Sequence, residues 1–289
     1  MRFGLVGTGY WARVTHAPAL TSTEGVELAA VWGRSPAASA ELAGAHNVPA
    51  HTDVDAFLAE VDAVAFAVPP DVQAPIAIRA ARQGKHLLLE KPIAISPADA
   101  DALAEAVEQN SVASVVFFTA RFQPQIRDWL ASVAAGNWLG GTALWLGTAL
   151  RESSPFNTPW RHDRGALWDV GPHMVSLLWA SLGPVTGVTA AAGPADVVHL
   201  VLRHESGASS VLTATLSAAP AVATAQLSVW GDPGRSEAPL ASVEAVPALR
   251  TALTELTAAA TSSQLSHPCD VRFGHAVGRV LTAAQHQLQ

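Results

Sequence analysis

Residues 2–12, Arg2-Phe3-Gly4-Leu5-Val6-Gly7-Thr8-Gly9-Tyr10-Trp11-Ala12, contain the clearest fold signal in this chain. A short apolar run ends in the pattern G-x-G-x-x-A, and a helical pattern follows through about Leu20. Gly7 permits a tight turn, Gly9 lets the backbone approach a pyrophosphate, and Ala12 keeps helix and strand close. The amides at the start of such a helix point at the phosphates. The segment therefore predicts a dinucleotide-binding βα unit.

Apolar runs and amphipathic stretches alternate through the rest of the first 120 residues. We expect further strands at 26–32, 61–68, 86–89 and 112–119, and helices at 36–44, 72–83 and 97–109. Alternation at this spacing indicates βαβ units and a parallel sheet. Because such crossovers are right-handed, a Rossmann domain is the simplest arrangement.

The regular alternation of strands and helices stops after residue 119. We expect a helix at 122–134, a strand at 141–150, a helix within 165–182, strands at 185–192, 197–203, 209–217 and 222–230, and helices at 246–260 and 269–287. Loose alternation along the last strands is typical of antiparallel strands with one covered face. The sequence thus predicts an α/β protein with two domains. Residues 1–120 form an N-terminal Rossmann dinucleotide-binding domain. Residues 121–289 form a C-terminal α+β domain for substrate binding and oligomerisation, with an open, mainly antiparallel sheet, and its last helix can pack back on the first domain.

The composition excludes several classes of protein. A net charge of −7 and a pI near 5.8 give no basic footprint, so we expect no nucleic-acid partner. The apolar run before Gly7 is too short for a secretory segment, and no stretch approaches the about 20 apolar residues of a membrane span. The single cysteine, Cys269, fits a reducing cytoplasm. An open apolar sheet face, in turn, marks an interface, so we expect a homodimer or homotetramer formed through the C-terminal sheet.

The end of the second strand bears on the choice of cofactor. A domain that prefers NAD usually carries an acidic residue there for the ribose hydroxyls. Here the sequence is Val31-Trp32-Gly33-Arg34-Ser35, without an acid. Arg34 can pair with a 2′-phosphate and Ser35 can donate to it, which favours NADP over NAD. The alternative is that Arg34 is an ordinary exposed loop residue.

Both lysines of the chain, Lys85 and Lys91, fall within residues 84–92. Lys91 follows the apolar run 87–89, and ligands bind at the carboxyl ends of strands in open α/β sheets. A lysine can give or take a proton, whereas an arginine stays protonated. Lys91 is therefore a candidate functional group, although a surface turn residue is the alternative.

Three motifs, in this order, resemble the glucose–fructose oxidoreductase, inositol dehydrogenase and rhizopine-catabolism (Gfo/Idh/MocA) oxidoreductases. They are residues 7–12, residues 84–92 with Glu90-Lys91-Pro92, and residues 165–173 with the pattern G-x-x-x-D-x-G-x-H. Lesser similarities lie at 67–70, 121–124 and 160–161. The resemblance spans essentially the whole chain. It implies a Rossmann domain followed by an α/β domain whose open sheet mediates oligomerisation.

The resemblance implies a catalytic set of Lys91, Asp169 and His173. Lys91 would hydrogen-bond the reacting oxygen and His173 would act as general base, although these two roles could exchange. Asp169 would orient the substrate hydroxyl and hold the other two groups in useful protonation states. A helix that begins at or just after Asp169 would put Asp169 and His173 on one face. The alternative is a helix cap at Asp169 and a core histidine at His173.

The remaining candidate residues fall into two groups, and no metal is expected. The cofactor would be contacted by Gly7, Thr8, Gly9, Tyr10, Trp11, Gly33, Arg34, Ser35, Val68, Pro69, Glu90 and Lys91. The substrate pocket would be shaped by Arg121, Phe122, Trp160 and Arg161, each of which is equally consistent with ordinary packing between domains.

The expected function is that of an NAD(P)-dependent oxidoreductase. It would transfer a hydride between the nicotinamide and a carbinol or carbonyl carbon of a sugar, polyol or cyclic hydroxy compound. One alternative is a redox-assisted glycosidase with a bound dinucleotide. Another is a non-catalytic sensor of a dinucleotide or sugar, against which the intact Lys91, Asp169 and His173 argue.

Overall fold

The computed structural model describes residues 1–262 and 264–288. The chain forms two compact units, each made of two separate stretches. The first is Met1–Phe122 with Glu244–Ala276, and the second is Gln123–Val243 with Val277–Gln289. The domain boundary expected between residues 120 and 121 stays a prediction.

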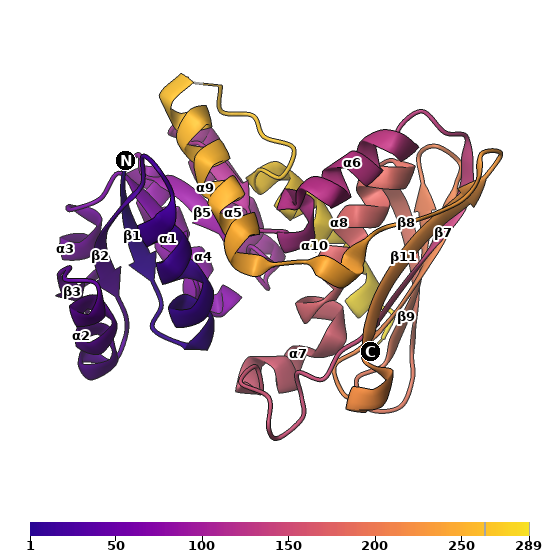
Figure 1. The fold of residues 1–289 in the computed structure, drawn as a ribbon, viewed down its shortest axis with the longest axis horizontal. Coiled ribbons are helices and arrows are strands. Elements are labelled where there is room, and N and C mark those ends of the chain that lie inside the picture. Colours follow the sequence, from indigo (N-terminus) through magenta and orange to yellow (C-terminus); the bar gives the residue numbers. More distant parts are fainter. Residues whose placement is uncertain (263, 289) are drawn as a thin grey trace. The chain divides into compact units, whose positions relative to one another are not determined.

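The first unit contains a parallel six-stranded sheet in the order β3-β2-β1-β4-β5-β6. This is the strand order of a doubly wound dinucleotide-binding fold, and it confirms the predicted Rossmann domain (Figure 1). The central strands are buried on both faces, which explains their continuous apolar runs. The strands are β1 (Arg2–Val6), β2 (Glu27–Trp32), β3 (Ala50–His51), β4 (Ala63–Phe66), β5 (His86–Leu89) and β6 (Ser114–Val116).

Side-chain caps begin several helices of this unit. Ser35, Asp53 and Ser96 accept hydrogen bonds from the backbone N–H three residues on, as residues at this position commonly do. The short β3 and α3 were not expected, because two and five residues are too few for a periodic pattern. The helical elements are η1 (Ala12–His16), α1 (Ala17–Ser22), α2 (Pro36–Ala45), α3 (Val54–Leu58), α4 (Pro70–Arg82), α5 (Pro97–Gln109), η2 (Thr119–Phe122) and α9 (Ala245–Ser262), with the start of α10 (Val271–Gln285).

The second unit contains a six-stranded sheet in the order β12-β11-β7-β10-β9-β8. Its neighbouring strands are antiparallel except for the parallel pair β7 and β10. The predicted mainly antiparallel sheet is thus confirmed, and only the edge strand β12 was not expected. The strands are β7 (Trp138–Leu146), β8 (Val185–Ala192), β9 (Val198–His204), β10 (Ser209–Thr215), β11 (Thr224–Gly231) and β12 (Gly234–Glu237).

The two faces of this second sheet differ in burial. Along β9, buried and exposed residues alternate strictly, which is the pattern of a sheet covered on one face. Leu200 and Leu202 are on the buried face, and α8 (Gly171–Leu182) packs against β7, β10 and β11. Val201 and Val211, paired across β9 and β10, are on the other face and are each 43% exposed. The other helices here are α6 (Pro124–Val133) and α7 (Pro159–Asp169), with the end of α10.

Two histidines titrate below their ordinary range. Burial lowers the pKa of His204 below 6.5, although its contact with the Gly183 carbonyl opposes the shift. The two ring nitrogens of His204 lie 2.8 Å from the Gly183 oxygen and 2.8 Å from the Ser210 Oγ, so the neutral ring is fully hydrogen-bonded. Burial likewise lowers the pKa of His86, against a smaller opposing effect of Asp62.

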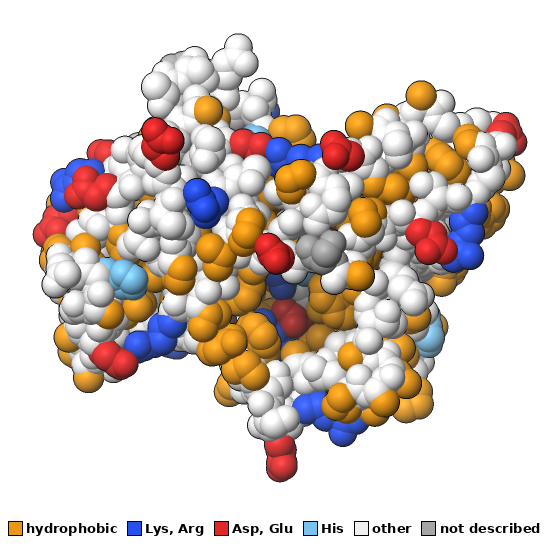
Figure 2. Space-filling model, viewed as in Figure 1, with side chains coloured by type: hydrophobic (Ala, Val, Ile, Leu, Met, Phe, Trp, Pro, Cys, Tyr) orange, Lys and Arg blue, Asp and Glu red, His pale blue; other side chains and the backbone are white. Residues whose placement is uncertain are grey.

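The surface fits the acidic composition. On the face shown in Figure 2, basic side chains are scattered among acidic ones rather than gathered into one patch. None of the helices in the described part of the chain is both long enough and apolar enough to cross a membrane.

Candidate functional site

The glycine motif forms the turn between β1 and η1. Gly7 has a φ of +130°, and a Cβ placed there would lie 2.4 Å from the carbonyl oxygen of Ala67. At Gly9, by contrast, a Cβ would meet no atom of the described residues within 4 Å. Gly7 therefore permits the close approach of two strand ends, while Gly9 leaves open space above the loop. This arrangement fits the pyrophosphate of a dinucleotide, which needs bare backbone beside a helix start.

The end of β2 lies against this loop. A Cβ at Gly33 would lie 2.7 Å from the Thr8 Cγ2, so these two predicted cofactor residues are in close contact. Arg34 is exposed, and it makes no hydrogen bond or ion pair with residues 1–262 or 264–288. The Ser35 Oγ accepts from the Ala38 N–H at 3.4 Å, which caps α2 and leaves the hydroxyl proton of Ser35 available.

The end of β4 borders the same loop. The Val68 Cγ1 would lie 3.2 Å from a Cβ at Gly7, and Pro69 is the N-cap residue of α4. Tyr10 and Trp11 begin the helix after the loop, and Tyr10 is 47% exposed.

Glu90 and Lys91 follow β5 directly, as predicted, and the Lys91–Pro92 peptide is cis. The fully buried side chain of Gln73, from α4, holds the backbone on both sides of Lys91. Its Oε1 accepts from the Glu90 N–H at 2.8 Å, and its Nε2 donates to the carbonyl oxygens of Glu90 at 2.8 Å and Ile93 at 3.2 Å. Gln73 was not among the predicted site residues, although an uncharged polar residue on the apolar side of an amphipathic helix was a usable signal.

The structure brings the predicted cofactor residues of the first unit to one edge of its sheet. They follow β1, β2, β4 and β5, which are neighbours in the sheet and parallel. The carboxyl ends of parallel strands share one edge, where open α/β sheets bind their ligands.

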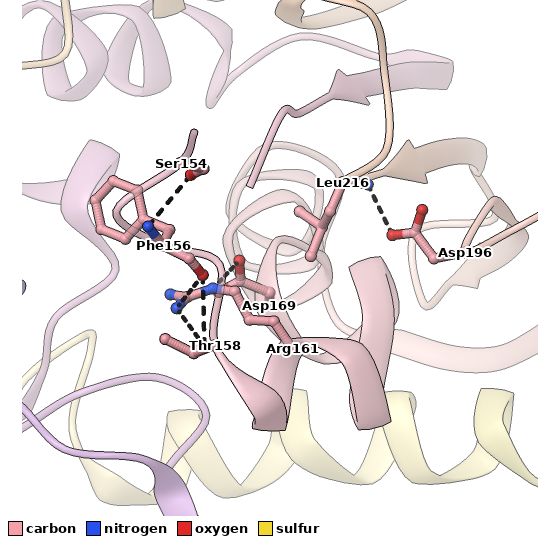
Figure 3. Close-up of polar contacts among 7 residues, drawn as sticks. All are labelled: Ser154, Phe156, Thr158, Arg161, Asp169, Asp196 and Leu216. Carbon is pink, nitrogen blue, oxygen red and sulfur yellow. Dashed lines mark hydrogen bonds and ion pairs between the residues drawn. The ribbon is translucent and has the colours of Figure 1, made fainter. Parts of the chain in front are cut away.

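In the second unit, Asp169 is the last residue of α7, and α8 begins at Gly171. Val170, not Asp169, occupies the N-cap position of α8, so the helix-cap alternative for Asp169 is wrong. The Asp169 carboxylate is instead held by Arg161, whose Nε donates to Oδ2 at 2.8 Å (Figure 3). Gly165, with a φ of 61°, kinks α7 between these two residues.

Arg161 is itself fixed by several groups. Its Nη1 donates to the Phe156 carbonyl and to the Thr158 Oγ1, both at 3.2 Å. The guanidinium also lies over the rings of Trp160 and Phe156, 4.9 and 5.3 Å from their centroids. A planar guanidinium is suited to such stacking and to forked hydrogen bonds, whereas the compact ammonium group of a lysine is not. Arg161 therefore orients Asp169.

His173 lies in the first turn of α8 and is half-buried. Its ring stacks on Trp145 of β7, with centroids 5.7 Å apart and planes 18° apart. Trp145 was not among the predicted site residues, because in the sequence it is only an aromatic residue within an expected strand. The stack restricts the orientation of the imidazole.

The other two candidates, Arg121 and Phe122, lie in η2 of the first unit. Phe122 is fully buried and stacks on His267, with centroids 5.9 Å apart. Arg121 lies over the ring of Phe273 at 5.5 Å. These contacts favour the packing alternative for Phe122. No cluster of three or more His, Cys, Asp or Glu side chains that could hold a metal ion occurs within the described residues.

Two family models match this chain. One, described as the oxidoreductase family with an NAD-binding Rossmann fold, matches residues 1–118. The other, the GFO/IDH/MocA C-terminal domain, matches residues 102–237. Among curated relatives, inositol 2-dehydrogenase of Rhizobium meliloti (strain 1021) is 29% identical over 227 residues, which are 74% of this chain and 68% of that protein.

Solved structures share the whole fold. UDP-N-acetylglucosamine 3-dehydrogenase from Acidithiobacillus ferrooxidans has a TM-score of 0.82 at 22% identity, covering 100% of this chain and 99% of that one. Levoglucosan dehydrogenase in complex with NADH has a TM-score of 0.82 at 18% identity, covering 99% and 96%. At these identities the likeness shows the fold alone. The two family models, which together span residues 1–237, confirm the resemblance of the motifs: the chain belongs to the Gfo/Idh/MocA family of NAD-binding oxidoreductases.

Proposed function

We propose that this oxidoreductase interconverts a carbinol and a carbonyl group on a sugar, polyol or cyclic hydroxy compound. The observation that carries the proposal is the position of Lys91, which follows β5 at the sheet edge that also bears the open glycine loop. Relatives named as inositol 2-dehydrogenase and UDP-N-acetylglucosamine 3-dehydrogenase support a hydroxylated substrate.

The chemistry divides between the bound dinucleotide and the side chains. A bound nicotinamide accepts or donates the hydride. Lys91 donates a hydrogen bond to the reacting oxygen and stabilises the negative charge that develops there. His173 takes or returns the hydroxyl proton, because an imidazole titrates near neutral pH. Asp169, oriented by Arg161, holds the substrate hydroxyl. That these groups act on one substrate is part of the proposal.

We further propose that NADP is the preferred cofactor. Two features support this: Arg34 is exposed without a partner among the described residues, and the Ser35 hydroxyl retains its proton. No acidic residue lies within residues 31–35 to receive the ribose hydroxyls of NAD. A guanidinium and a hydroxyl are suitable donors for a 2′-phosphate.

The proposal also includes a homodimer or homotetramer in the cytoplasm. Val201, Val211 and Trp230 leave apolar area on strands of the second sheet, each more than 40% exposed. A second copy would cover this area. The single cysteine, Cys269, is buried, and a chain with one cysteine has no internal disulfide, which suits a reducing compartment. Light scattering of the purified protein tests the oligomer, and a monomer at micromolar concentration would contradict it.

The decisive experiment screens inositols, aldoses and polyols for absorbance change with NADP or NAD. Lys91→Ala and Lys91→Arg should each lower turnover about 100-fold or more, the scale of losing one preorganised donor. Lys85→Arg is the matched control, because Lys85 donates to the backbone oxygen of Val61 instead. Normal turnover of Lys91→Arg would contradict the catalytic role and favour the alternative that Lys91 is a surface turn residue.

Other outcomes separate the alternatives. His173→Asn should abolish most activity and remove one ionisation from the pH–rate profile; if both persisted, the proton transfer would belong to Lys91. Glycoside cleavage without net change in NAD(P)H would indicate the redox-assisted glycosidase. Dinucleotide binding without turnover on any substrate would indicate a sensor.

A further inference from the structure

The carboxylate of Glu90 connects the helix after the glycine loop to Lys91. Its Oε1 accepts from the Trp11 Nε1 at 2.7 Å and lies 3.1 Å from the His16 Nε2. Its Oε2 accepts from the backbone N–H of Lys91 at 3.3 Å. The side chain of Glu90 is only 13% exposed and that of His16 is fully buried. One largely buried carboxylate thus bonds both to the helix after the glycine loop and to the backbone of Lys91.

A π-helical turn lets Trp11 and His16 reach the same oxygen. These residues are five apart, and in an α-helix they would point about 140° away from each other. Over η1 (Ala12–His16) the backbone instead bonds from residue i+5, and the Ala17 N–H donates to the Ala12 carbonyl. The wider turn brings residues five apart nearer to one face. Single π-turns of this kind often occur at functional sites.

The hydrogen bonds assign the protons of this network. The Nδ1 of His16 is buried and has no hydrogen-bond partner among the described residues. A proton on Nδ1 would be an unsatisfied buried donor, so the proton belongs on Nε2, from which it is donated to Glu90. Glu90 then receives three N–H donors, from Trp11, His16 and Lys91, so both of its oxygens act as acceptors.

We propose that Glu90 is a positioning residue for the reaction. It does not touch the substrate; it fixes the Lys91 turn relative to the helix that begins at the dinucleotide loop. This inference rests on the proposed role of Lys91. Because Gln73 still holds the turn and Gly7 and Gly9 still form the loop, loss of the Glu90 charge should loosen Lys91 more than it weakens cofactor binding. Small displacements of a catalytic group reduce the rate steeply.

The test replaces Glu90 by its closest uncharged analogue. In Glu90→Gln the amide nitrogen must face either the Lys91 N–H or the two ring donors, so one side of the network becomes repulsive. Although we expected Glu90 to contact the cofactor, both of its oxygens accept hydrogen bonds from the protein. We therefore expect kcat to fall about 10-fold or more, while the dissociation constant of the cofactor changes by less than about threefold. Glu41→Gln is the matched control: Glu41 pairs with Arg13 of the same π-helical turn, is 70% exposed and has no contact with Lys91 among its described interactions.

A second variant keeps the test decisive if Glu90→Gln folds poorly. Trp11→Phe removes one donor to Glu90 and preserves an aromatic ring, so it should also lower kcat. In the double variant the loss should be smaller than the product of the two single losses, because both act through one carboxylate. Unchanged kcat in Glu90→Gln or in Trp11→Phe, with Lys91→Ala inactive, would overturn the positioning role. An active Lys91→Ala would instead overturn the proposed function.

Discussion

Alanine substitutions at Gly7 and Gly9 should have different consequences, although the two residues lie in one loop: the first should lower stability and the second should lower cofactor affinity. At Gly7 the backbone has a φ of +130°, and an added Cβ would lie 2.4 Å from the Ala67 oxygen. Forcing a side chain into such a backbone conformation costs about 1–3 kcal/mol, and overpacking against a fixed neighbour costs about 1–3 kcal/mol more. We expect Gly7→Ala to lose roughly 3 kcal/mol or more of unfolding free energy on these grounds.

Gly9→Ala should leave the fold intact, because its Cβ would meet no described atom within 4 Å. Reduced freedom of the unfolded chain should add up to about 1 kcal/mol of stability. The methyl group would instead fill the space in which we propose that a pyrophosphate approaches the backbone. We expect cofactor affinity to fall tenfold or more, which corresponds to about 1.4 kcal/mol.

Thermal unfolding without cofactor and cofactor titration by calorimetry separate the two effects. For a unit of this size, 3 kcal/mol lowers Tm by roughly 6–12 °C, so Gly7→Ala should melt measurably earlier and Gly9→Ala should not. A Gly7→Ala variant with unchanged Tm would refute the close approach of β1 and β4. Wild-type affinity in Gly9→Ala would refute the pyrophosphate position.

Three further changes test other parts of the molecule. Arg34→Ala should weaken NADP binding by one to two decades, since a charge-assisted contact contributes about 1.5–3 kcal/mol, and should leave NAD nearly unaffected; tighter binding of NAD than NADP by the unmodified protein would contradict the cofactor preference. Arg161→Ala removes a donor to the buried Asp169 carboxylate and should lower stability by about 3 kcal/mol in urea unfolding; an unchanged midpoint would show that the pair contributes nothing. Burial lowers the pKa of His204 in the folded protein, so the unfolded chain binds a proton at His204 more readily than the folded chain does. The stability that the neutral, hydrogen-bonded ring contributes is therefore complete above pH 6.5 and is lost as the pH falls. Between pH 7.5 and 5, His204→Gln should therefore lose less stability than the unmodified protein, and the loss that remains should be due in part to His86. A loss as steep as that of the unmodified protein would contradict this reasoning.

Much of the first sheet followed from local sequence. The helix at 97–109 and the strand at 86–89 were predicted with their observed bounds, because a proline after a capping serine and a continuous apolar run are signals contained in the segment itself. The same local rules did not reveal α7, whose pattern is interrupted at Gly165. Nor did they reveal that α9 packs against α1 and β5 of the first unit.

Local sequence patterns were sufficient to predict the Rossmann sheet, the glycine turn and the placement of Lys91 at a strand end, because periodicity and turn chemistry act over about ten residues. The contacts that orient these groups depend on the packing of the folded chain. Gln73 and Glu90 are 17 residues apart, and Trp11 and Glu90 are 79 apart. No local pattern encodes such pairs, since they depend on which helix packs beside which strand. Hydrogen bonds between distant side chains form only once the apolar core has fixed the backbone that carries them.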